Sequence, residues 1–164
     1  MIATRGAMLL IRRHFLGVGE GGNVGVDSGG GRVRSATRIF AYERELKHAI
    51  RRELARVEPG LVEADGGRER VVATGKIDIT AVDANGHFVV IELKAGPCPS
   101  GALEQVLGYS SDLERETGTP CRAVLVASEF SDRLRAAALR ARDVSLITYE
   151  VGQVNLESSA QLSL

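Results

Sequence analysis

The sequence predicts an α/β domain in which a mixed β-sheet is flanked by helices. Short β-branched and apolar runs, such as RAVLVA at 122–127, are typical of buried strands. These runs alternate with helical patterns in the order helix, strand meander, helix, strand, helix, strand. That order predicts antiparallel strands in the first part of the domain and βαβ-like connections in the second part. The length of 164 residues suits a single domain with its own core.

The first half of the domain begins with an amphipathic helix from Arg38. Ile39, Leu46, Ile50 and Leu54 fall on one face of it, and the Pro-Gly pair at 59–60 ends it. A meander of extended segments follows, in which DANG suits a tight hairpin turn. We expect these segments at 61–63, 70–73, 76–82 and 88–94, with the DANG turn at 83–86.

The second half of the domain is predicted to contain two helices and two strands. One helix starts at Ser100 or Gly101 and reaches about 116, and a buried strand follows at 122–127. Ser131 can cap a second helix that reaches about Arg142. The run VSLITYEV forms the last strand.

The N-terminal segment differs in composition from the rest. Eight of the fifteen positions from Gly17 to Gly31 are glycine, and such a segment loses much entropy on ordering. We therefore expect a flexible tail over 1–37, with a short apolar anchor at Met8–Ile11, a domain over 38–152 and a C-terminal tail over 153–164. GVGEGG lacks the strand–loop–helix context and the Lys of a phosphate loop, so a nucleotide-binding enzyme is disfavoured.

Composition excludes several other classes. No apolar run is long enough to span a bilayer, and the balance of 21 basic and 21 acidic residues argues against strong nonspecific nucleic-acid binding. The three histidines are scattered, so structural zinc has no support. Cys98 and Cys121 are expected to be free thiols rather than a disulfide, which points to a cytoplasmic protein.

Lysine is scarce among the basic residues. Only Lys47, Lys76 and Lys94 occur among the 21, and arginine fills the other positions. A GC-rich genome would explain this preference. A lysine inside an expected strand then suggests a chemical role, because ammonium is a compact charge whose pKa shifts readily.

Polar residues interrupt two of the apolar strands. Glu92 and Lys94 are two positions apart and share one face, and Asp78 is expected on a face with Lys76 and Thr80, opposite Ile77, Ile79 and Ala81. Pairing through the DANG turn would bring Asp78 close to Glu92. Two adjacent carboxylates repel, and a divalent cation such as Mg²⁺ removes that penalty. Lys94 could then orient a water and stabilise charge that develops on a phosphate.

These motifs resemble the PD-(D/E)XK nuclease superfamily, in its RecB-like and NucS-like branches. Ile77-Asp78 and, after thirteen residues, Glu92-Leu93-Lys94 match its two halves. A glutamate in YERELKHAI and the Gln-x-x-x-Tyr of QVLGY match its flanking helices. The resemblance covers about residues 38–152 and implies a restriction-endonuclease-like fold.

The resemblance also implies roles for individual residues. Asp78 and Glu92 would bind Mg²⁺, with Mn²⁺ as an alternative, and the Leu93 carbonyl would add a ligand. Lys94 would serve the attacking water. Glu43 would complete the site, and it is preferred to Glu45 because it shares the apolar stripe of the helix. Gln105 would orient Lys94 or the phosphate, and Tyr109 would support Gln105.

Simpler interpretations remain open for each motif. ELK could lie on a solvated edge strand, and Asp78 could cap a turn. Glu43 could be a helix-surface acid, and Gln105 and Tyr109 could be packing residues. Three arginines of the first helix could contact DNA, although a solvated helix face is favoured for them: Arg51, Arg52 and Arg56.

The sequence therefore predicts a Mg²⁺-dependent DNA endonuclease acting in repair, recombination or defence. Hydrolysis by a positioned water would leave a 3′-hydroxyl and a 5′-phosphate, as the resemblance implies. The alternative is a nuclease-like module that binds DNA or a partner with little turnover. The glycine-rich segment where NucS-like proteins carry a β-rich DNA-binding domain motivates that alternative, as do Ala95 and Gly108, which replace residues that are often basic there. Domains of this kind often pair as homodimers.

Overall fold

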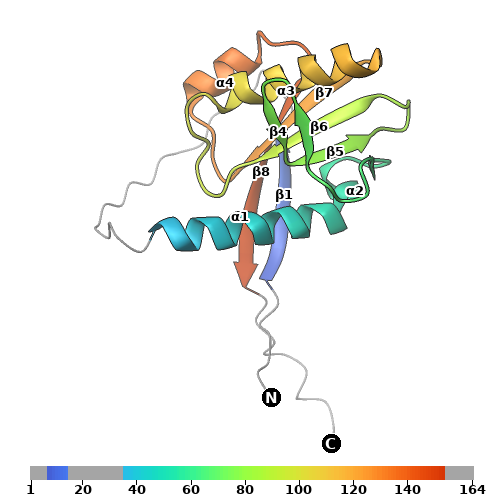
Figure 1. Cartoon of the computed structure of the whole chain (residues 1–164). Helices are drawn as coiled ribbons and strands as arrows, with labels where there is room; N and C mark the ends of the chain where they lie inside the picture. The colour runs from blue at the N-terminus through green and yellow to red at the C-terminus, as the bar shows by residue number, and fades with distance from the viewer. Residues whose placement is uncertain (1–6, 15–34, 154–164) are drawn as a thin grey trace, which may run out of the picture.

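A computed structural model describes residues 7–14 and 35–153, with side chains described from 43 to 150 (Figure 1). Over this part of the chain, no helix has the length and apolar character needed to cross a membrane. The helices and strands follow one another in this order: β1 Ala7–His14, α1 Ser35–Arg52, α2 Leu54–Val57, β2 Val62–Glu63, β3 Arg70–Val72, β4 Gly75–Ile77, β5 Ile79–Val82, β6 Phe88–Leu93, α3 Ala102–Thr117, β7 Cys121–Ala127, α4 Asp132–Ala138 and β8 Val144–Gln153.

The main sheet is mixed, as the sequence predicts. Its six strands lie in the order β1-β8-β7-β6-β5-β2. β5 and β6 pair antiparallel through the DANG turn, with Ile79 opposite Ile91. β6, β7 and β8 are parallel, because a helix connects each strand to the next. β3 and β4 form a separate two-stranded hairpin instead of joining the predicted meander.

Helices cover both faces of the sheet (Figure 1). On one face, Val89, Ile91 and Leu93 of β6 pack with Leu46 and Ile50 of α1. On the other face, the strand residues Val90 and Leu125 pack in a cluster with Val106 and Leu113 of α3 and Ala138 of α4. Successive side chains of β6 point to opposite faces of the sheet, and helices cover both faces. β6 is therefore buried on both sides.

The expected strand over 76–82 is interrupted at Asp78. Ile77 packs in the cluster on the α3 face, whereas Ile79 and Ala81 pack in the cluster on the α1 face. The prediction that these three side chains share a face is therefore wrong. Asp78 Oδ2 accepts the Leu93 N–H at 3.0 Å, a donor that a continued strand would otherwise have to satisfy. The backbone changes direction at Asp78, which leaves its carboxylate between the sheet and α1.

The N-terminal prediction also needs correction at one point. Ala7–His14, which includes the expected anchor Met8–Ile11, forms an edge strand antiparallel to β8. Helix α1 starts at Ser35 and β8 reaches Gln153, so both extend slightly past the expected 38–152. The rest of the predicted tails, at 1–6, 15–34 and 154–164, lies outside the described residues. The division into tails and domain stays a prediction.

Candidate active site

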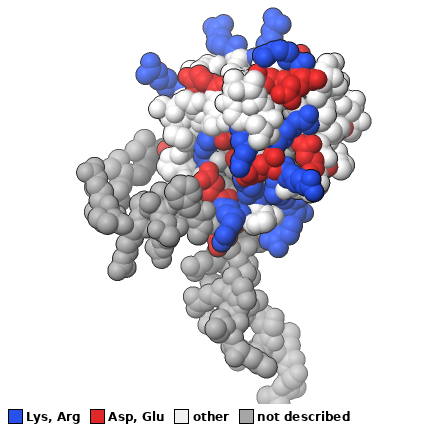
Figure 2. Space-filling model, in the orientation of Figure 1, with Lys and Arg blue, Asp and Glu red and all other residues white. Residues whose placement is uncertain are grey.

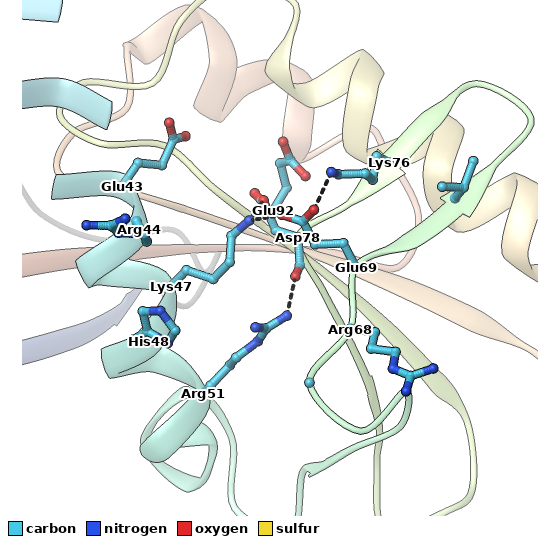
Figure 3. A pocket seen from close by; sticks show the side chains of 12 residues that line it. Glu43, Arg44, Lys47, His48, Arg51, Arg68, Glu69, Lys76, Asp78 and Glu92 are labelled. Atoms are coloured by element: carbon cyan, nitrogen blue, oxygen red, sulfur yellow. Dashed lines mark hydrogen bonds and ion pairs between the residues drawn. The ribbon is translucent and has the colours of Figure 1, made fainter. Parts of the chain in front are cut away.

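A charged cleft of about 790 Å³ opens between α1, the β3–β4 hairpin and the end of β6. Its lining includes four carboxylates, namely Glu43, Glu69, Asp78 and Glu92, and also five lysine or arginine side chains. Acidic and basic groups are intermixed on the face of the molecule shown in Figure 2. Figure 3 shows the cleft from close by, with side chains from α1 facing those of the hairpin and sheet. The cleft holds the predicted acidic residues together with cations that can neutralise them.

Lys94 lies at the centre of a hydrogen-bonded chain that joins β6 to α3. Its Nζ donates to Glu92 Oε1 at 2.8 Å and to Gln105 Oε1 at 2.8 Å. The Nε2 of Gln105 donates in turn to the Tyr109 hydroxyl at 2.7 Å. Because Gln105 and Tyr109 are one helical turn apart, both can reach the same side of the sheet. The sequence-predicted Glu92, Lys94, Gln105 and Tyr109 are thus brought together.

Asp78 lies between β4 and β5 and is held by contacts with two other elements, β6 and α1. One carboxylate oxygen, Oδ2, accepts the Leu93 N–H, and the other, Oδ1, lies 2.6 Å from Lys47 Nζ of α1. Arg51 Nη2 donates to the Asp78 backbone carbonyl at 3.2 Å. The kink at Asp78 is therefore fixed by interactions with both β6 and α1.

Glu92 is nearly inaccessible to solvent, with 4% of its surface exposed. Oε1 is bound by Lys94, whereas the buried Oε2 has no hydrogen-bond partner. Burial, followed by the negative charge of Asp78, raises the pKa of Glu92 to about 7. A buried carboxylate oxygen without a donor, next to a second carboxylate, is a suitable ligand for a divalent cation.

Other parts of the predicted ligand set are less complete. Glu43 lines the cleft, while Glu45 is exposed and does not. Within residues 43–150, no three His, Cys, Asp or Glu side chains form a group that could hold a metal by themselves. Asp78 and Glu92 thus provide two protein carboxylates. The contributions of Glu43 and of the Leu93 carbonyl stay predictions.

Because the pKa of the buried Glu92 is raised, we expect the metal-free protein to lose stability as the pH rises. Since its folded pKa of about 7 exceeds its ordinary 4.5, the folded state binds more protons between these values. The free energy of unfolding should therefore fall by about 3 kcal/mol between about pH 5 and about pH 8. Glu92→Gln should remove that part of the slope in urea unfolding with EDTA. Equal slopes in both proteins would contradict the assignment.

Among the cleft residues that were not predicted as part of the site, three are joined by ion pairs: Lys47, Glu69 and Lys76. Lys47 Nζ lies 2.6 Å from Glu69 Oε1, and Lys76 pairs with Glu69 Oε2. These two lysines lower the pKa of Glu69 to about 2. With Lys94, all three lysines of the chain lie at this cleft or beside it. Their scarcity in the sequence was the signal that could have identified Lys47 and Lys76.

Gly75 is another residue that sequence reasoning missed. A Cβ added there would lie 2.5 Å from the Tyr109 hydroxyl oxygen and 2.8 Å from Tyr109 Cε1. The absence of a side chain at Gly75 therefore allows Tyr109 to approach the hairpin. The hairpin is also held at Thr74, whose N–H and hydroxyl both donate to the buried Asp112 of α3.

The structure also decides between several of the simpler interpretations. β6 lies between β5 and β7, so ELK is not on an edge strand. Arg51 lines the cleft and pairs with Glu63 at 2.9 Å, rather than lying on a solvated face. Arg52 is exposed, and Arg56 pairs with Glu53 on the surface. Tyr109 is both buried in the α3 core and hydrogen-bonded to Gln105.

Comparison with known families agrees with this geometry. The family described as the endonuclease NucS C-terminal domain matches residues 42–151. The chain belongs to this family. The match runs from within α1 to within β8 and includes the Asp78, Glu92, Lys94 and Gln105 positions, which supports the nuclease-superfamily resemblance inferred from the motifs.

Relatives of this NucS C-terminal domain include two proteins named endonuclease NucS. The one from Methanopyrus kandleri is 33% identical over 97 residues, which cover 59% of this chain and 36% of the relative. The one from Thermococcus kodakarensis is 33% identical over 93 residues, which cover 57% of this chain and 36% of the relative. The aligned part therefore spans only about a third of the length of these curated relatives.

Two solved structures share the fold. A repair endonuclease from Pyrococcus abyssi superimposes with a TM-score of 0.56 at 23% identity, covering 73% of this chain and 49% of that one. A structure described as an EndoMS–dsDNA complex superimposes with a TM-score of 0.53 at 22% identity, covering 76% and 49%. These similarities confirm the α/β fold predicted for the NucS C-terminal domain.

Proposed function

We propose that the chain hydrolyses phosphodiester bonds of DNA as a divalent-metal-dependent endonuclease in repair, recombination or defence. The observation that carries this proposal is the meeting of Asp78 and Glu92 in one cleft, with Lys94 bonded to Glu92 Oε1 and with Glu92 Oε2 buried and without a donor. Membership of the NucS C-terminal domain family supports it, as do the relatives named endonuclease NucS and the neighbour described with double-stranded DNA.

Asp78 and Glu92 would hold the cation, with the Leu93 carbonyl and, through water, Glu43 as further ligands. Carboxylate oxygens suit Mg²⁺ or Mn²⁺, and the free Glu92 Oε2 fits such a group. When bound, the cation would supply Lewis-acid stabilisation of the phosphate charge. The repulsion between Asp78 and Glu92, which adds to burial in raising the pKa of Glu92, would then be relieved.

Lys94 would act on the attacking water and on the charge that develops on the phosphate. Its ammonium has Glu92 and Gln105 as acceptors, so it is already oriented before a substrate would bind. Gln105 is a positioning residue, because it holds Lys94 and is itself held by the Tyr109 hydroxyl. The products would be a 3′-hydroxyl and a 5′-phosphate.

A nicking assay on supercoiled plasmid DNA tests this function. We expect nicked and linear DNA with Mg²⁺ or Mn²⁺, no cleavage with EDTA, and loss of cleavage in Asp78→Ala, which removes one cation ligand. A panel of labelled mismatched, branched and single-stranded substrates would then identify the preferred DNA. Cleavage that persists in EDTA, or in Asp78→Ala at the wild-type rate, would contradict the proposal.

The second candidate function is a nuclease-like module that binds DNA or a partner without turnover. The ion pair between Lys47 and Asp78 favours this alternative, because the ammonium already neutralises one of the two carboxylates. The zero net charge does not favour strong nonspecific binding to DNA. DNA binding without cleavage under any divalent metal would support the module.

A cytoplasmic location and pairing into a homodimer complete the proposal. Cys98 and Cys121 are free thiols, which suits a reducing compartment. Sedimentation velocity of the full chain would test the homodimer.

A further inference from the structure

Lys47 lines the cleft and pairs with two of its carboxylates. Its Nζ lies 2.6 Å from Asp78 Oδ1 and 2.6 Å from Glu69 Oε1, so one ammonium bridges two carboxylates. The side chains of Lys47 and Asp78 are only 16% and 18% exposed, which limits screening by solvent and salt. Figure 3 shows the Lys47 side chain reaching from α1 toward Asp78.

The two carboxylates proposed as cation ligands each have one oxygen that is bound within the β-sheet region. Asp78 Oδ2 accepts the Leu93 N–H, and Glu92 Oε1 accepts from Lys94. Glu92 Oε2 has no hydrogen-bond partner and is free to bind a cation. A cation held by both carboxylates would also need the second oxygen of Asp78, which is Oδ1. Lys47 holds that oxygen. A divalent cation and an ammonium repel each other and cannot both bind it closely.

We propose that Lys47 is an internal counter-ion that competes with the divalent cation for Asp78, and that Glu69 retains Lys47 when the cation binds. This inference rests on the proposed metal-dependent function and adds a residue that sets metal affinity. Glu69 is suited to this role because it already pairs with Lys47 at 2.6 Å. Lys47 therefore loses one ion pair, not two, when it leaves Asp78.

If Lys47 competes with the metal for Asp78, the effects of Lys47 and Glu69 substitutions on metal affinity should not be additive. Lys47→Ala should tighten Mn²⁺ and Mg²⁺ binding by about tenfold, because Asp78 Oδ1 becomes free. Glu69→Gln should weaken metal binding by about fivefold, because Lys47 is then left with Asp78 alone. In the Lys47→Ala background, Glu69→Gln should change nothing, because its effect acts through Lys47. Bulk charge effects would instead add in the double variant.

The experiment is a double-mutant cycle measured as metal dissociation constants by isothermal titration calorimetry on the full chain without DNA. Lys76→Ala is the matched control, because it removes the same charge from the same partner Glu69, yet its side chain is 58% exposed and forms no ion pair with Asp78 in the described structure. We expect it to change the metal dissociation constant by no more than about twofold. Circular dichroism verifies the fold of each variant.

Three results would overturn the inference. They are unchanged metal affinity in Lys47→Ala, a Glu69→Gln effect of equal size in both backgrounds, and equal effects of the Lys47 and Lys76 variants. The second result would make Glu69 a direct metal ligand. A protein that binds no metal, even as Lys47→Ala, would contradict the metal-dependent function itself. Metal binding that Lys47→Ala leaves unchanged would contradict this inference alone.

A spectroscopic measurement tests the displacement directly. With ¹³Cε-labelled lysine, the chain contains only three labelled side chains, and Lys→Arg variants assign each signal. Titration with diamagnetic Mg²⁺ should shift the Lys47 and Lys94 signals and leave Lys76 nearly unchanged. A Lys47 signal that does not respond while calorimetry detects binding would contradict displacement.

Discussion

Lys94→Ala is expected to lower the rate of DNA cleavage by about 100-fold to about 1,000-fold while DNA binding persists. Lys94 is the amine that bonds Glu92 and Gln105, so in the proposed mechanism its loss removes the ammonium that would stabilise charge on the phosphate. The measurement is single-turnover cleavage of a labelled duplex with Mg²⁺, paired with anisotropy of the same duplex in EDTA.

Two further variants make the Lys94 result specific. Arg133→Ala removes a positive charge from the exposed surface of α4 and should leave the rate unchanged. Lys94→Arg retains the charge but not the compact ammonium geometry, so we expect it to remain strongly impaired. If Lys94→Ala cleaves within about threefold of the wild type, or Lys94→Arg restores the full rate, the assigned role is wrong.

Gly75→Ala should damage both stability and activity, although Gly75 contacts no substrate in the proposed mechanism. The added Cβ would lie 2.5 Å from the Tyr109 hydroxyl oxygen and 3.0 Å from its Cζ, so Tyr109 or the hairpin must move. Forced overpacking of this kind costs about 1–3 kcal/mol. Movement of Tyr109 also withdraws the acceptor that holds Gln105, and Gln105 holds Lys94.

Urea unfolding and single-turnover cleavage measure the two effects of Gly75→Ala. Gly86→Ala is the matched control, because Gly86 also has a positive φ, of +80°, but nothing lies within 4 Å of its added Cβ. It should cost some stability and leave the cleavage rate unchanged. Tyr109→Phe combined with Gly75→Ala removes the closest clashing atom and should recover part of the stability. Equal effects of the Gly75 and Gly86 substitutions on cleavage would rule out the steric explanation.

The sheet order shows which kinds of fold information are local. The DANG turn and the alternation in FVVIELK correctly predicted the β5–β6 hairpin and the shared face of Glu92 and Lys94, because both depend on neighbouring residues. The β3–β4 hairpin was expected within the meander because no local signal shows which strands pair. The same is true of Ala7–His14, whose partner β8 lies at the opposite end of the chain.

Within the site, Asp78 shows the same difference between what local sequence predicts and what long-range contacts decide. Its place before a thirteen-residue spacing and ELK identified it, but the face on which Ile77 lies was predicted wrongly. The kink depends on the Leu93 N–H and on Lys47 and Arg51 of α1. None of these contacts follows from the alternation rule, because each joins Asp78 to β6 or to α1 rather than to its neighbours in the chain.

The sequence by itself determined the fold class, the family motifs and the convergence of Asp78, Glu92 and Lys94. Strand periodicity, turn chemistry and motif spacing act over a few residues and can be read along the chain. Tertiary structure alone decided that Lys47 and Glu69 meet at Asp78 and that Gly75 leaves space for Tyr109. These contacts join residues far apart in the chain, and they form only when α1, the β3–β4 hairpin and α3 pack around the end of β6.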